Sequence, residues 1–119
     1  MMTNKEIIEI ANIYEKRKNE KQPIGFDISN CFYLDINLYN IIMSLIGHIY
    51  TFLRDCIIPK HCHSYKDYFL GGGIDINCAK CIVEHFRNSG FKVSWRMNTD
   101  QQKPNGIYYI SLSWEEEGE

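Results

Sequence analysis

Apolar residues recur at helical spacing in several stretches of this 119-residue chain. The first stretch begins at a capping box formed by Thr3 and Glu6, whose side chains can each bond a backbone amide at a helix start. It predicts a helix over 3–20, which must end before Pro23. The longest apolar stretch, 37–58, follows the i, i+3, i+4, i+7 rule and predicts a buried central helix.

A third helical pattern opens the segment 75–114. Asp75 or Asn77 can cap the first amides of this helix, and Gly90 suits a left-handed C-terminal cap. Two alternating segments follow, separated by the turn-rich NTDQQKPNG, and they predict an antiparallel hairpin with one apolar face. The positions that share this face are Phe91, Val93, Trp95 and Met97 in one strand, and Tyr108, Ile110, Leu112 and Trp114 in the other.

The remaining segments are less regular. Residues 24–28 and 32–36 alternate briefly, which indicates two short strands or an extended entry into the central helix. The segment HCHSYKDYFLGGG, 61–73, is expected to form a loop or a short irregular helix. The sequence therefore predicts one α+β domain over 1–119, with three helices packed on a small antiparallel sheet whose main element is the C-terminal β-hairpin. An acidic tail, 115–119, ends the chain.

The central apolar segment raises the question of a membrane span, because no charged residue occurs from Ile36 to Leu53. A span needs about 20 mainly apolar residues. This segment carries Asn40, Ser44 and His48 on one arc, which favours a buried helix over a span. The N-terminus is charged at once and has no long apolar run, so no secretory signal is expected and the predicted location is cytoplasmic.

Five cysteines in a chain expected to stay in the cytosol favour reduced thiols over a disulfide framework. Helical spacing brings two of them and one histidine within about 60° of arc on the last helix. With one more ligand from the segment before it, this face could hold a structural zinc ion. The same face is also expected to pack on the hairpin, and the core role is the favoured interpretation. The candidate zinc ligands are Cys78, Cys81 and His85 on the helix and His61, Cys62 and His63 before it.

One group of residues could contact nucleic acid. Lys92, Arg96 and Tyr109 fall on the outward face of the predicted hairpin, where an aromatic ring between cations can stack bases. The other hairpin aromatics fall on the inward face, and the net charge of −2 offers no broad basic surface. The sequence favours a protein partner or self-association over nucleic acid or membrane.

No catalytic constellation emerges from the pattern. The chain has no G-x-S-x-G elbow, and Gly71–Gly73 lacks the Gly-Lys-Ser/Thr of a phosphate-binding loop. Cys31, Cys56 and Cys62 have no base whose position the sequence indicates. No catalytic residue is therefore assigned, and zinc is the one cofactor considered.

The runs NSGFKVSW and GIYYISLSW resemble a pattern in small uncharacterised proteins of large DNA viruses and some phages. In those proteins a helix ends in a glycine-aromatic turn and a hairpin closes on Ile-Ser-Trp-like residues. The resemblance covers the C-terminal third of the chain, implies a viral or phage origin and supplies no catalytic residues. The sequence thus predicts a non-enzymatic structural or protein-interaction protein, virion-associated or engaging a host protein in the host cytoplasm. The alternative is a zinc-stabilised nucleic-acid-binding module.

Overall fold

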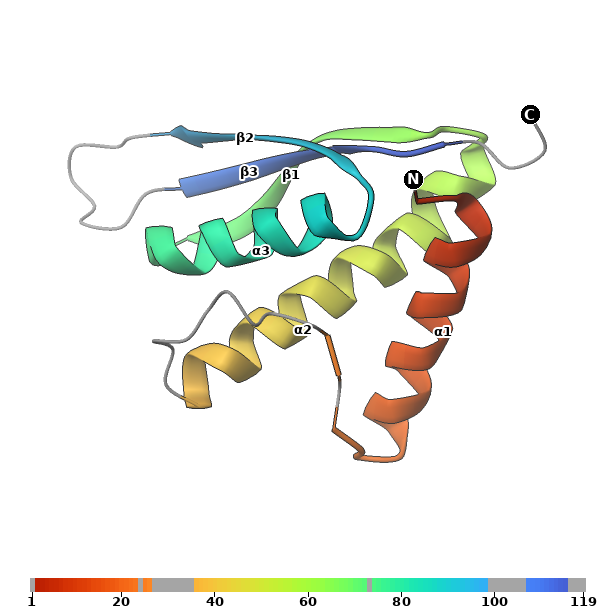
Figure 1. Ribbon diagram of the computed structural model, residues 1–119, viewed down its shortest axis with the longest axis horizontal. Helices are drawn as coiled ribbons and strands as arrows, with labels where there is room; N and C mark the ends of the chain where they lie inside the picture. The colour runs from red at the N-terminus through yellow and green to blue at the C-terminus, as the bar shows by residue number, and fades with distance from the viewer. Residues whose placement is uncertain (1, 24, 27–35, 73, 99–106, 116–119) are drawn as a thin grey trace.

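A computed structural model describes residues 2–23, 25–26, 36–72, 74–98 and 107–115. Its elements form an antiparallel sheet of order β1-β3-β2 with helices against it, which confirms the predicted α+β class (Figure 1). In chain order they are α1 (Asn4–Asn19), α2 (Ile36–Phe52), a π-helical turn (Leu53–Ile57), a 3-10 turn (Ile58–Lys60), β1 (Ser64–Gly72), α3 (Ile76–Asn88), β2 (Lys92–Asn98) and β3 (Ile107–Ser113).

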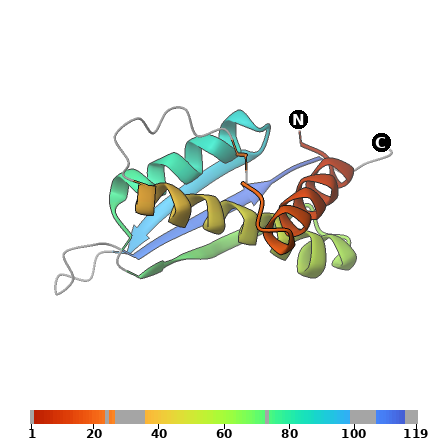
Figure 2. The same ribbon diagram turned by 90° about the horizontal axis from the view of Figure 1, so that it is seen from below.

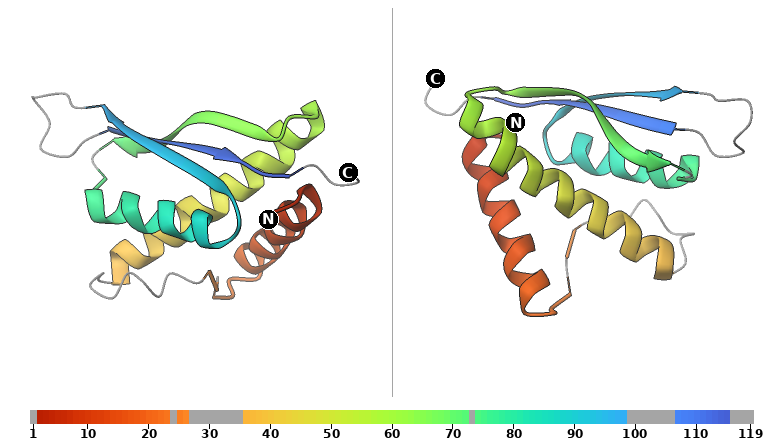
Figure 3. Two further views of the ribbon diagram at one scale, coloured as in Figure 1. Left: turned by 45° about the horizontal axis from the view of Figure 1, so that its top comes forward. Right: turned by 180° about the vertical axis from the view of Figure 1, so that it is seen from behind.

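The described helices all lie on one side of the sheet. α3 runs directly beneath the strands, α2 crosses below it, and α1 diverges from α2 as the two arms of a V (Figures 1 and 2). The opposite face of the sheet carries no described helix, as the tilted view and the view from behind also show (Figure 3). One sheet face is therefore covered and the other is open.

The predicted helix ends are present. The Thr3 hydroxyl accepts a hydrogen bond from the Glu6 amide at 3.3 Å, and the Asp75 carboxylate accepts one from the Asn77 amide at 2.7 Å. Gly90 has a φ of 107°, the left-handed region that glycine adopts without strain. These three local predictions are confirmed. Most of the short strands expected over 24–28 and 32–36 lie outside the described residues.

The C-terminal hairpin and its shared apolar face are confirmed. Val93 pairs with Leu112 and Trp95 pairs with Ile110, so the apolar positions of β2 and β3 share one face. Along β3 the side chains at 108, 110 and 112 are buried, and those between them are partly exposed. This alternation places the apolar face against the helices.

The prediction of a loop or short irregular helix over 61–73 is wrong, because Ser64–Gly72 forms the edge strand β1. Its alternation is broken by two irregularities in the pairing with β3, one between Tyr65 and Tyr68. Two residues of β1, Lys66 and Asp67, oppose one residue of β3 there, Ser111, and Asp67 takes a positive φ of 59°. A bulge of this kind shifts side chains between faces, so the period of two that marks a strand in sequence is lost.

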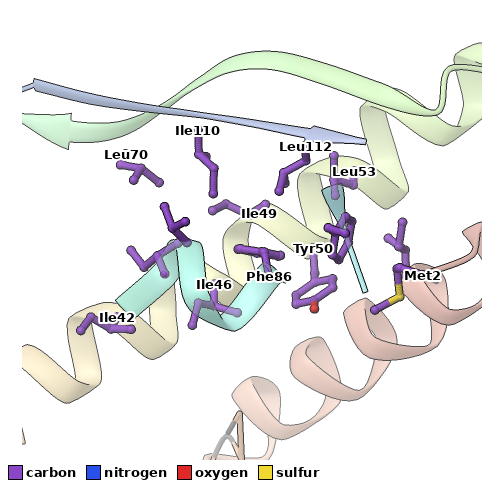
Figure 4. Packing of buried hydrophobic residues seen from close by; sticks show 14 of the residues in the cluster. Met2, Ile42, Ile46, Ile49, Tyr50, Leu53, Leu70, Phe86, Ile110 and Leu112 are labelled. Carbon is purple, nitrogen blue, oxygen red and sulfur yellow. The ribbon is translucent and has the colours of Figure 1, made fainter. Parts of the chain in front are cut away.

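The core lies between the sheet and the crossing of α2 with α3 (Figure 4). α2 supplies Ile42, Ile46, Ile49 and Tyr50, and the sheet supplies residues such as Ile110. The N-terminus joins this core as well, since the Met2 side chain is 3% exposed. The Met2 amide donates to the Gly90 carbonyl at 3.2 Å, and the Met2 carbonyl accepts from the Glu115 amide at 2.9 Å. Residues 116–119 of the acidic tail are not described.

The central apolar segment departs from a single α-helix over 37–58. It is α-helical to Phe52 and then continues through the π-helical and 3-10 turns to Lys60. By length and composition, 36–60 could cross a membrane, but 44% of its most apolar window is buried inside the fold. A helix at the core of a folded domain passes the same test, so this segment does not indicate where the protein resides.

Arg54, in the π-helical turn, links α1 to the end of the central segment. Its guanidinium bonds the Glu15 carboxylate at 2.6 Å, the Asn12 amide oxygen at 2.9 Å and the Asp55 carboxylate at 2.7 Å. These hydrogen bonds, from Asp55 first, raise the pKa of Arg54 and keep it charged. The Arg54 side chain is 16% exposed while both carboxylates are about half exposed, so solvent weakens the pairs.

Replacing Arg54 with methionine is expected to lower the free energy of unfolding by about 1 kcal/mol, because its bonds to α1 are lost while the apolar stem is kept. Urea unfolding followed by circular dichroism measures this change. Arg87→Met is the matched control, since Arg87 pairs with Glu84 within α3 and both side chains are exposed. An equal loss in both variants would contradict a role for Arg54 in joining α1 to the core.

Candidate functional site

The open face of the sheet carries a row of three large side chains, one from each strand. Phe69 of β1 pairs with Tyr109 of β3, and Tyr109 pairs with Arg96 of β2. The Phe69 and Tyr109 ring centroids are 5.7 Å apart. Phe69 is 51% exposed, which is unusual for a residue of its size. We call Phe69, Tyr109 and Arg96 the platform row.

Arg96 is held in place on both sides. Its guanidinium carbon lies 4.2 Å from the centroid of the Tyr109 ring, a cation–π geometry. Nε also donates to the Asp67 carboxylate at 3.0 Å, which raises the pKa of the guanidinium. Asp67 is in turn oriented by its bulge, because its amide donates to the Ser111 hydroxyl at 3.1 Å. The planar cation therefore lies against the sheet while its side chain remains 53% exposed.

Beside the platform row, the sheet surface is hollowed by a shallow groove of about 280 Å³. Lys66 and Lys92 line it, one from each edge strand, and their side chains are exposed. Hydroxyl groups from all three strands line it as well, together with Val93 and Leu112, and none of the described lining residues carries a carboxylate. Two ammonium groups among hydroxyls form a surface that suits an anion. The serines of this groove are Ser64, Ser94, Ser111 and Ser113.

The candidate nucleic-acid contacts from sequence lie together on this face. Arg96 and Tyr109 are direct cross-strand partners, and Lys92 lies on the same strand as Arg96, at the groove. Phe69 and Lys66 were not among the predicted contacts, because they belong to β1, and a loop or short irregular helix was expected there. The run YKDYFL contains aromatic residues, which favour strands, but no β-branched residue. Its bulge also removes the alternation from which the face of each side chain could have been predicted.

The candidate zinc ligands are distributed over two parts of the fold. His61 and His63 lie in the connection from the 3-10 turn to β1, and Cys78 and His85 are buried on α3. Nε2 of His85 and the Tyr50 hydroxyl are 3.3 Å apart. Over the described ranges, no group of three histidine, cysteine or acidic residues could hold a metal ion. The function proposed below therefore does not involve zinc.

The cysteines depart from the expected fully reduced set. Cys81 is in a disulfide, whereas Cys56, Cys62 and Cys78 remain thiols. Cys78 is 2% exposed and packs in the core, which agrees with its predicted role as a small apolar residue. A zinc site that used the Cys81 sulfur would first require this disulfide to be reduced. Cys31 lies outside the residues that the structure describes.

No family model, curated protein or solved structure matches this chain.

Proposed function

We propose that this protein is a non-enzymatic binding protein that takes single-stranded nucleic acid on the open face of its sheet. The observation that carries the proposal is the platform row, Phe69, Tyr109 and Arg96, next to a groove that holds Lys66 and Lys92. Exposed aromatic and guanidinium planes stack bases of any sequence, and lysines follow the phosphates. A base at the row and a phosphate in the groove would use both features at once.

The spacing along the strands supports this arrangement. Tyr109, in the row, and Ser113, in the groove, are four residues apart on the central strand, which corresponds to about 13 Å. The bound strand would run parallel to β3, with a base over Phe69 or Arg96 and the backbone over the lysines. Because Asp67 and Tyr109 already orient Arg96, its planar group loses little freedom on binding.

Fluorescence anisotropy with a labelled oligothymidylate tests the proposal. Binding is expected to weaken with salt, because neutralised phosphates release counterions. The double variant Lys66→Gln/Lys92→Gln should weaken binding and reduce the log–log salt slope by about 1.4, which is two phosphate contacts at about 0.7 each. Phe69→Ala should weaken binding about tenfold at every salt concentration, since a stacked base contributes about 1–3 kcal/mol.

The matched control for charge is Lys5→Gln/Lys16→Gln, which removes two exposed cations from α1, away from the open face. This variant should keep the salt slope of the parent protein. Equal losses in the two double variants would mean that binding follows net charge and not this face. An oligonucleotide that does not bind at low salt would remove the proposal.

A protein partner is the second candidate, and the edge of β2 favours it. In the described sheet β2 pairs with β3 on one side and with no strand on the other, and its pairing is regular from Lys92 to Asn98. Such an edge can accept a strand from another chain. Concentration-dependent mass by light scattering would favour this function. The virion-associated or host-interaction role implied by the sequence remains a prediction.

A further inference from the structure

We propose that a cavity between α1, α2 and α3 binds a small carboxylic acid with an apolar body. The cavity has a volume of about 330 Å³ and lies on the helical side of the molecule, away from the open sheet face. It occupies the V between α1 and α2, toward which Tyr50 points from α2 (Figure 4). This volume is at the lower end of the range for small-molecule sites, about 300–1,000 Å³.

The walls of the cavity are mainly apolar and aromatic. Ile10 and Ile13 of α1 form one side, and the Phe26 ring forms part of another. Phe26 stacks against Tyr50 with ring centroids 5.7 Å apart and against Tyr14 at 6.2 Å. These rings offer flat surfaces to an apolar ligand, so the body of the ligand is expected to be a hydrocarbon chain or an aromatic ring.

Polar side chains of Tyr50, His85 and Ser89 line another part of the cavity. Burial raises the pKa of the Tyr50 phenol, which therefore stays protonated at physiological pH. Its hydroxyl lies 3.3 Å from Nε2 of His85, and the Ser89 hydroxyl donates to the His85 carbonyl at 2.8 Å. The Tyr50 and Ser89 hydroxyls therefore bring hydrogen-bonding groups without charge to the cavity.

Arg17 brings a positive charge to the cavity wall. Its guanidinium approaches the backbone at Gly25, where an added Cβ would lie 3.1 Å from a terminal nitrogen. Among the described residues, none forms an ion pair or a side-chain hydrogen bond with Arg17, and no carboxylate lines the cavity. One guanidinium matches one carboxylate through two parallel hydrogen bonds. The charge therefore favours a monoanion over a cation or a dianionic phosphate.

Titration calorimetry with 3-phenylpropionate and with octanoate, each against its primary amide, tests the proposal. At least one acid is expected to bind saturably, and its amide should bind about tenfold more weakly, since a charged hydrogen bond is worth about 1.5–3 kcal/mol. The better acid identifies whether the ligand body is aromatic or aliphatic. The absence of saturable binding by both acids, or equal binding of acid and amide, would overturn the proposal.

Three variants locate the site. Arg17→Gln should remove the preference for acid over amide, whereas Lys16→Gln, an exposed neighbour on the same helix, should keep it. Ile13→Trp should abolish binding by filling the mouth, and it is tolerable because Ile13 is 51% exposed. Chemical shifts of the unmodified protein give a check that needs no variant. Changes at Tyr14, Phe26 and His85 are expected, and changes confined to the sheet would contradict the location.

Discussion

Gly47→Val is expected to lower the free energy of unfolding by about 3 kcal/mol, because α1 and α2 approach each other where Gly47 has no side chain. A Cβ added at Gly47 would overlap the ring of Tyr14. That ring is 3% exposed and packs against Phe26 on one side and His48 on another, so it could give way only toward the cavity that it lines. The gain in helix propensity on replacing glycine, about 0.5 kcal/mol, is too small to offset this overlap.

Chemical denaturation of Gly47→Val beside Ser44→Val measures the effect. Ser44 lies one turn earlier in α2 and is exposed, so the same new side chain there should change stability by about 0.5 kcal/mol or less. Both variants should keep the dependence of the unfolding free energy on denaturant, because the surface exposed on unfolding is nearly unchanged. If both unfold at the denaturant concentration of the parent, the close approach of α1 to α2 at Gly47 is wrong.

Phe86→Ala is expected to lower the free energy of unfolding by about 4 kcal/mol, the typical cost of removing a buried phenylalanine ring. Phe86 is fully buried, and its ring centroid lies 5.1 Å from that of Tyr50 and 5.3 Å from that of Phe91. The surrounding side chains come from different elements, so they cannot collapse into the space without moving α3 relative to α2. Thermal and urea unfolding measure the loss.

Phe69→Ala is the matched comparison, since the same ring is removed from the open face of the sheet. It should cost about 1 kcal/mol or less, because one cross-strand contact with Tyr109 is lost and no cavity forms. Phe86→Ala is therefore expected to change mainly the stability of the fold, and Phe69→Ala mainly the affinity for an oligonucleotide. Phe69→Ala should retain the fold and lose oligonucleotide affinity, and a loss of stability as large as that of Phe86→Ala would show that the platform row is structural.

The local features of the fold were predictable because neighbours in sequence produce them. Thr3, Asp75 and Gly90 act on amides and carbonyls a few residues away, so their roles follow from residue type and spacing alone. The shared apolar face of the hairpin follows from a strict alternation in β2 and β3, because a slip of one residue would turn the apolar side chains to the other face. These elements also gave the α+β class.

The candidate site was predictable only in part, for a related reason. Lys92, Arg96 and Tyr109 belong to the regular hairpin, so their outward direction could be read from alternation. Phe69 and Lys66 belong to β1, where the bulge at Asp67 displaces the pattern and conceals the strand. The part of the candidate site on β2 and β3 was thus visible in the sequence, and the part on β1 was not.

By itself the sequence determined the helix caps, the hairpin and its apolar face, because each depends on contacts a few residues apart. The tertiary structure decided which residues meet across long separations. It paired β1 with β3, which put Phe69 beside Tyr109, and it brought Arg17, Phe26 and Tyr50 around one cavity. Such meetings depend on how whole elements pack, and packing is a property of the complete core, so no local pattern encodes it.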